Sequence, residues 1–297
     1  MHSKIFKGTK SDVIFDIVNT VLLILITLII LYPLYYIVIA SVSTPTMVLT
    51  GKVTLFPRGF QLESYKRVFS NPDIGRGYFN TILYTSLGTI INLIVTLPAA
   101  YSLSRKDLRG KNFIMMIFSF TMFFGGGTIP TFLVVKDLGL YNSFWALLIP
   151  SAMSVWNLII CRNFFEGSIP LELYEVSIID GCTNRKFFIQ IALPLSKALI
   201  AVMVLFYAVG HWNSYFSALL YLKDSELYPL QMVLRNILIS SQPDATLAGM
   251  TDRAKFYQEV EMLKYALVIV SSVPVLMLYP FVQKYFVKGV MIGSIKG

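Results

Sequence analysis

The strongest constraint on the fold of this 297-residue chain is a series of long apolar runs. A helix needs about 20 mostly apolar residues to cross the hydrocarbon core of a bilayer. The composition, 56% hydrophobic and 14% charged, is also far more apolar than that of an ordinary soluble domain. The sequence therefore predicts an all-helical, polytopic membrane protein with six transmembrane helices. These are expected near residues 16–42, 79–103, 112–135, 143–161, 195–222 and 265–284.

The positive charges predict which side of the membrane each connection faces. Basic residues gather before the first run, after the second and after the sixth, and these three places share one side of a six-span topology. By the positive-inside rule that side is cytoplasmic, so both termini are expected inside the cell. This placement accounts for the net charge of +9, and no nucleic-acid partner is predicted. The basic residues are Lys4, Lys7, Lys10, Arg105, Lys106, Arg109, Lys111, Lys284, Lys288 and Lys296.

A conspicuously polar segment, residues 171–194, separates the fourth apolar run from the fifth and is placed in the cytoplasm by the charge pattern. We call it the polar insert. Leu171, Tyr174 and Ile178 recur at helical spacing, which predicts one apolar face on a short helix. The dipeptide Asp180-Gly181 then predicts a turn, because glycine adopts backbone conformations that other residues avoid.

A second short helix is predicted after that turn. Thr183 is placed to cap its start, and Pro194 is expected to end it. Phe187, Phe188 and Ile191 should share its apolar side. Two short amphipathic helices of this kind also fit an interfacial loop that lies against lipid headgroups.

The spacing of particular residues in the polar insert resembles the EAA motif of permease subunits in binding-protein-dependent ABC importers. The residues that carry the resemblance are Glu175, Asp180, Gly181, Phe188, Ile191, Leu193 and Pro194. The chain departs from the motif at Val176-Ser177 and Cys182, where alanines are usual, and at Ala198, where proline is frequent. Residues 124–150 and 279–297 look like the carbohydrate branch of the same family, closest to maltose-type and complex-polysaccharide importers.

The resemblance implies a type I ABC importer permease fold in a bacterial plasma membrane. In that family the motif forms cytoplasmic coupling helices that sit in a cleft on the ATP-hydrolysing subunit. Glu175 would then contact the ATPase, Gly181 would form the turn, and Leu193-Pro194 would lead rigidly into the fifth span, with Asp180 and Phe188 in the same coupling set.

The resemblance also implies partners, and the apolar runs together with the positive charges predict a domain plan. The partners are a second homologous permease, a cytoplasmic ATPase dimer, an extracellular solute-binding protein, and a sugar or oligosaccharide. The plan is a cytoplasmic N-terminus (1–15), a first transmembrane helix (16–42), an extracellular segment (43–78), a core permease domain (79–290) that contains an extracellular segment at 223–264, and a cytoplasmic tail (291–297).

Motifs of enzyme chemistry are absent from the sequence. It contains no G-x-x-x-x-G-K-[ST] phosphate-binding loop, no H-E-x-x-H and no G-x-S-x-G. We therefore predict a transport subunit and not an enzyme. No cofactor is expected in this chain, because ATP and Mg²⁺ would be bound by the partner ATPase.

The predicted spans carry no Asp, Glu, Lys or Arg near their middle, which argues against ion coupling within this chain. Neutral polar and aromatic side chains suit a polyhydroxylated solute, and the pathway candidates are Trp212, Asn213, Tyr215 and Asn157. Two alternatives stay open: an ABC importer for peptides, amino acids or phosphate, and an ATP-independent channel or facilitator.

The third span contains three consecutive glycines, residues 125–127. Each costs a helix about 1 kcal/mol relative to alanine in water. We interpret them as sites of close helix packing in preference to a hinge, since small residues let neighbouring helices approach.

Overall fold

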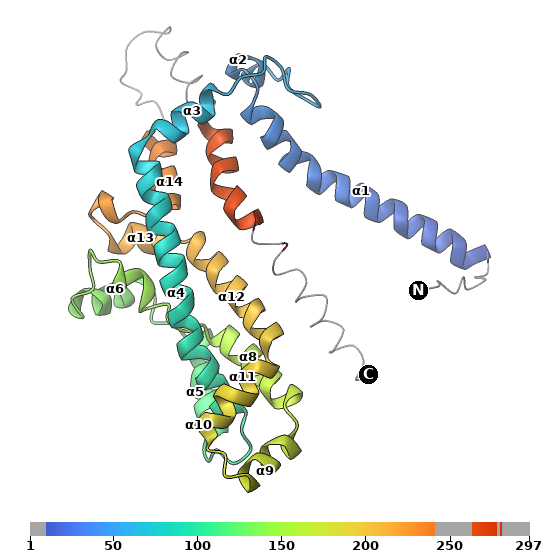
Figure 1. Ribbon diagram of the computed structural model, residues 1–297. Coiled ribbons are helices and arrows are strands. Elements are labelled where there is room, and N and C mark those ends of the chain that lie inside the picture. Colours follow the sequence, from blue (N-terminus) through green and yellow to red (C-terminus); the bar gives the residue numbers. More distant parts are fainter. Residues whose placement is uncertain (1–9, 241–262, 278–279, 281–297) are drawn as a thin grey trace. The chain divides into compact units, whose positions relative to one another are not determined.

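The computed structural model describes residues 10–240, 263–277 and 280, and within them every regular element is a helix (Figure 1). These residues divide into two compact units. One unit is built from residues within 1–70 and 240–270, and the other from residues within 71–239 and 271–297. The all-helical class predicted from the sequence is confirmed.

The first unit contains α1 (Lys10–Ser41), α2 (Pro45–Leu49) and α3 (Glu63–Ser70). Helix α1 is buried only at its last residues, and its other apolar side chains are exposed, as on a helix that faces lipid. A small core forms where the chain leaves α1, and there the rings of Tyr36 and Tyr265 meet edge to face with centroids 5.9 Å apart.

The second unit is organised around α4 (Pro72–Ser104), which packs along α12 (Lys197–Trp212) and α8 (Val155–Ser168) (Figure 1). Two polar contacts cross from α4 to α12. The Oδ1 atom of Asn92 lies 2.7 Å from Nε2 of His211, and the hydroxyls of Thr96 and Tyr207 lie 2.7 Å apart. Asn92 also donates from Nδ2 to the Ser151 carbonyl at 2.6 Å, so α4 holds the segment before α8 as well.

At its other end α4 holds the connection between α13 (Phe216–Tyr221) and α14 (Leu230–Ser240), which includes the 3₁₀ turn η2 (Ser225–Leu227). Asn80 donates from Nδ2 to the carbonyls of Glu226 and Tyr228, at 2.7 and 3.1 Å. Thr81 accepts the first backbone N–H of α14 at 2.8 Å. Buried backbone groups at this helix end are thereby satisfied.

The predicted spans differ from the observed helices in continuity. Only α1 and α4, among the described residues, are long and apolar enough to span a membrane unaided. Two bent pairs would each add a span, α5 (Lys111–Phe123) with α6 (Thr128–Asp137), and Asn184–Leu195 with α12. The count of six spans therefore stays a prediction.

The third predicted span is broken where the three glycines lie. The chain bends by 113° between α5 and α6, and Gly127 at this bend has a φ of 87°. Apart from chain neighbours, Pro130 alone among the described residues comes within 4 Å of a Cβ built on any of the three glycines. Within the described residues these glycines are therefore not sites of close helix packing, contrary to the prediction, and they supply backbone freedom at a break.

The fourth and fifth predicted spans are also interrupted. Residues 143–161 form a single turn, α7 (Trp145–Leu148), and a separate helix, α8, whose start is capped by the hydroxyl of Ser154. Residues 195–222 are divided between α12 and α13, with a break at 213–215.

The last predicted span, 265–284, begins as the helix Leu263–Met277, and its end at 281–284 lies outside the described residues. So do residues 1–9, most of the predicted segment 223–264, and the predicted tail 291–297.

Candidate functional site

The polar insert folds as two short helices joined by a tight turn, as predicted. The first is α9 (Leu171–Ile179) and the second begins with α10 (Asn184–Phe187). At the end of α9 the N–H of Gly181 bonds the Ile178 carbonyl at 2.9 Å, and the N–H of Cys182 bonds the Ser177 carbonyl at 2.8 Å. This pair of bonds is a Schellman motif, and Gly181 occupies its left-handed position with a φ of 71°.

The second helix starts where the sequence predicts but does not end there. The hydroxyl of Thr183 accepts the backbone N–H of Lys186 at 3.3 Å, which confirms the predicted cap. The chain then continues through a π-helical turn, η1 (Phe188–Ala192), and α11 (Leu193–Leu195), so Pro194 lies within helical backbone. The prediction that Pro194 ends this helix is wrong. The helix ends one residue after Pro194, and the chain bends by 82° at buried Ser196.

The buried side of α9 also differs from the prediction. Leu171 and Ile178 are exposed, whereas Ser177 is buried and Tyr174 is half-buried. The expected apolar face therefore has no cover within the described residues. Glu175 stands on the same exposed surface.

The second helix buries the side that the sequence predicts. Phe187 is fully buried, with Tyr101 of α4 stacked on one side and Tyr174 of α9 in edge contact, at centroid distances of 6.3 and 5.3 Å. Phe188 and Ile191 are half-buried against the same core. This aromatic packing fixes α10 and η1 against α4.

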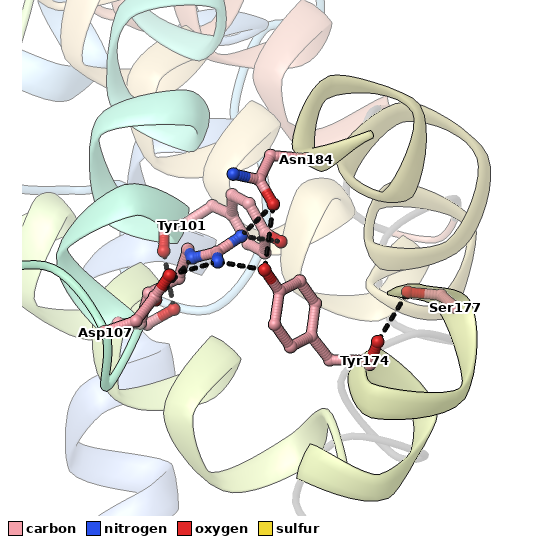
Figure 2. Close-up of polar contacts among 7 residues, drawn as sticks. Tyr101, Asp107, Tyr174, Ser177 and Asn184 are labelled. Carbon is pink, nitrogen blue, oxygen red and sulfur yellow. Dashed lines mark hydrogen bonds and ion pairs between the residues drawn. The ribbon is translucent and has the colours of Figure 1, made fainter. Parts of the chain in front are cut away.

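A cluster centred on Arg105, which sequence analysis assigned only to membrane topology, joins α4 to both helices of the insert. Arg105 is the residue at the C-terminal cap of α4, and its side chain is 12% exposed. Figure 2 shows Tyr101, Asp107, Tyr174 and Asn184 converging on one point. We call these four residues and Arg105 the Arg105 cluster.

The guanidinium of Arg105 bonds every other member of the cluster. Two parallel bonds reach Asp107, from Nε to Oδ1 at 2.8 Å and from Nη2 to Oδ2 at 2.5 Å. Nη1 donates to Oδ1 of Asn184 at 2.7 Å and, more weakly, to the Tyr101 hydroxyl at 3.5 Å. Nη2 also donates to the hydroxyl of Tyr174, whose ring lies against the guanidinium carbon at 4.3 Å. The Tyr174 hydroxyl in turn donates to Oδ1 of Asn184 at 2.9 Å.

Arg105 and Asp107 both stay charged across the physiological pH range. Hydrogen bonding to Asp107 raises the pKa of Arg105 above its ordinary value, although burial alone would lower it. The same bonds hold the pKa of Asp107 below its usual range. The pair therefore acts as a permanent ion pair at the base of the insert.

A cavity of about 310 Å³ opens beside this cluster. Its walls come from the end of α4, the end of α8 and the start of α9. They include Tyr101, Arg105, Phe165, Ile169, Tyr174 and Phe187. Beside this space, Tyr174 of α9 reaches the end of α4 through its bond with Arg105.

The four candidate pathway residues lie at or beside helix ends. Trp212 is the last residue of α12 and is buried, with its indole N–H donating to the Ser271 carbonyl at 3.0 Å. Asn213 donates back to the Val209 carbonyl at 3.0 Å, and Tyr215 is exposed in the break before α13. Asn157 is buried in the first turn of α8. Their role in a pathway stays a prediction.

The described residues contain no group of three His, Cys, Asp or Glu side chains placed to hold a metal ion.

The fold and the polar insert define a transport subunit of the membrane, and comparison with known proteins supplies the family. Residues 74–292 match the family described as binding-protein-dependent transport system inner membrane component. The chain belongs to this family, as its resemblance to the EAA motif predicted.

Two curated relatives come from Bacillus subtilis (strain 168). The chain is 43% identical to Protein LplC over 290 residues, which cover 98% of this chain and 97% of the relative. It is 41% identical to the polygalacturonan/rhamnogalacturonan transport system permease protein YtcP over 285 residues, which cover 96% and 99%.

A solved structure shares the fold. It is a crystal structure of a bacterial ABC transporter involved in the import of the acidic polysaccharide alginate. The two chains superpose with a TM-score of 0.83 at 34% sequence identity, and the match covers 94% of this chain and 99% of the other. The predicted ABC permease fold is confirmed.

Proposed function

We propose that this chain is one permease subunit of an ATP-driven importer of a sugar or oligosaccharide. It would form half of the translocation pathway, beside a second homologous permease. Its family membership supports a transport role, and YtcP and the alginate transporter support a saccharide cargo.

The observation that carries the coupling part of this proposal is the polar insert. The turn, the cap and the inward-facing aromatic side chains of the insert make contacts within this chain. The outer surface of α9, by contrast, is exposed and apolar beside Glu175. Such a surface on a charged, cytoplasmic segment suits the cleft of an ATPase subunit. The residues proposed for coupling are Glu175, Asp180, Gly181, Phe188, Leu193 and Pro194.

The rest of the assembly follows from the same proposal. An ATPase dimer binds ATP and Mg²⁺, and this chain binds no cofactor. A solute-binding protein delivers the cargo on the outer side, and both termini of this chain face the cytoplasm of a bacterium. Trp212, Asn213, Tyr215 and Asn157 are the proposed pathway residues. Two of them, Asn213 and Tyr215, lie in the break at 213–215, and Trp212 directly precedes it.

Purification of this chain in mild detergent from its native membrane, with mass spectrometry of the bound proteins, tests the assembly. We expect a second permease and an ATPase. The purified complex in proteoliposomes, with the binding protein, should then take up an oligosaccharide only when ATP is hydrolysed. A non-hydrolysable ATP analogue is the matched control.

The cargo panel should contain neutral and acidic oligosaccharides, a peptide, an amino acid and phosphate. Acidic sugars belong in it because alginate is acidic, whereas the side chains near the break suit a neutral solute. ATP-dependent uptake of a peptide alone would contradict the saccharide proposal. Recovery of the chain without an ATPase, together with ATP-independent flux, would instead indicate a facilitator.

A further inference from the structure

Arg105 has a bonding pattern that is complete within this chain. A guanidinium carries five N–H donors, and here each has an acceptor: two go to Asp107, and one each to Tyr101, Tyr174 and Asn184. No donor is left for a ligand. The pattern suits a structural junction better than an ion-binding site.

The acceptors belong to separate elements. Tyr101 is in the last turn of α4 and Asp107 follows it in the loop to α5, whereas Tyr174 is on α9 and Asn184 begins α10. Arg105 is 69 residues from Tyr174 and 79 residues from Asn184 along the chain. The covalent chain links the insert directly only to α8 and α12, so the Arg105 cluster provides an additional link, to α4.

This link matters most for α9. Helix α9 buries only Ser177, and a cavity lies between its start and the end of α4. Tyr174 therefore supplies the contact of α9 with the Arg105 cluster, through its hydroxyl and its ring face. Lysine could not replace Arg105, because its single ammonium group cannot form the parallel bonds to Asp107 and also reach the other acceptors.

We propose that Arg105 is a positioning residue that ties both helices of the polar insert to α4, so that displacement of the insert moves α4 together with α8 and α12. This rests on the proposed function, in which an ATPase displaces the insert. Helix α4 is suited to carry the movement, since it runs unbroken for 33 residues and is bonded to α12 through Asn92 and Thr96. Loss of the junction should separate ATP hydrolysis from transport without dissociating the complex.

The test compares variants of the whole reconstituted complex. Arg105→Lys keeps the positive charge but removes the guanidinium that forms two parallel bonds to Asp107. Asn184→Ala removes the acceptor on α10. Tyr174→Phe removes one hydroxyl but keeps the ring against Phe187. Arg109→Lys is the matched control, since Arg109 is an exposed cation in the same loop. The measurements are ATPase recovered with the complex, ATP hydrolysed, and oligosaccharide imported per ATP.

We expect all four variants to retain the ATPase and to hydrolyse ATP. Import per ATP should fall about fivefold or more in Arg105→Lys, the lower end of typical coupling energies. It should fall less in Tyr174→Phe and stay unchanged in Arg109→Lys. The double variant Arg105→Lys with Tyr174→Phe should lose less than the sum of the two single losses, because either change removes the bond between Arg105 and Tyr174.

Wild-type import per ATP in Arg105→Lys, or additive losses in the double variant, would overturn the proposal. If Arg105→Lys does not assemble, Asn184→Ala and Tyr174→Phe decide, and wild-type import per ATP in both would also overturn it. Failure of the proposed function looks different, because the wild-type complex would then show no ATP-dependent import at all.

Discussion

Gly181 shows how one residue sets the shape of the polar insert. Its φ of 71° is required by the Schellman motif, and no atom of the described part of the chain lies within 4 Å of a Cβ added there. Within this chain, any effect of a side chain at this position therefore comes from the backbone and not from a clash. An L-residue in this conformation costs about 1–2 kcal/mol.

We expect Gly181→Ala to weaken the turn by about that amount, and Gly181→Val to weaken it further, since a β-branched residue is poorly suited to positive φ. The variants should stay in the membrane, and import per ATP should fall in the order wild type, alanine, valine. The matched control is Gly167→Ala in α8, where a Cβ also meets open space but φ is not positive. Wild-type coupling in Gly181→Val would show that the turn has no part in coupling.

Gly88 presents the opposite case, because a side chain added there would clash with a neighbouring residue. A Cβ built on Gly88 would stand 2.4 Å from Nε2 of His211, the atom that contacts Asn92. Moving the ring aside would break that contact and leave a buried amide oxygen without it. We expect Gly88→Ala to destabilise the protein by about 1–3 kcal/mol, as overpacking does.

Thermal unfolding in detergent measures this loss, and Gly75→Ala is the matched control on the same helix, because its Cβ would meet nothing within 4 Å. Equal melting temperatures for the two variants would contradict the predicted clash.

Asp107 gives the Arg105 cluster a defined dependence on pH. Its folded pKa is lowered by the bonds from Arg105, so its contribution to stability is present above the unfolded pKa of about 3.9 and is lost as the pH falls through the lower folded value. The melting-temperature difference between wild type and Asp107→Asn should therefore be constant from about pH 8 to about pH 5 and narrow only below about pH 4. Narrowing near neutral pH would point to a different titrating group.

Among the elements, the bent pair α5–α6 depends on its glycines. Gly127 has a φ of 87° and a ψ of 171°, a region that only glycine occupies readily and that costs other residues about 1–3 kcal/mol. Gly127→Ala should therefore lower the melting temperature. Gly125→Ala should have little effect, because a Cβ there meets open space and φ is not positive. Equal effects would indicate that the two helices can straighten into a continuous span.

The elements also show what the sequence can and cannot predict. The two helices of the insert, its turn and the Thr183 cap were predictable because their signals are local, within a few residues of each other. The breaks at 124–127 and 213–215 were not, because a hydropathy window of about 20 residues averages over a short turn between two apolar helices. The Arg105 cluster was missed for another reason. Its partners are far away in sequence, and a basic residue at the end of a span already had an explanation in membrane topology.

At the scale of the whole molecule, the exposed outer surface of α9 is where the proposed ATPase would dock. Ile179 is 85% exposed, although it ends an apolar helix that faces the proposed ATPase. Covering a side chain of this size stabilises an interface by about 1.5–3 kcal/mol. Because Ile179 has so little contact with its own chain, its replacement should affect association and not folding.

We expect Ile179→Ser to leave the melting temperature of the isolated subunit unchanged and to weaken its binding to the ATPase by about tenfold or more, the factor that corresponds to about 1.4 kcal/mol. Leu55→Ser is a suitable control, since Leu55 is also exposed but lies in the segment predicted to be extracellular. Titration of the ATPase onto each variant in nanodiscs measures the affinities. Equal affinity for wild type and Ile179→Ser would mean that the ATPase docks elsewhere, and the exposed side of α9 would then face lipid headgroups instead.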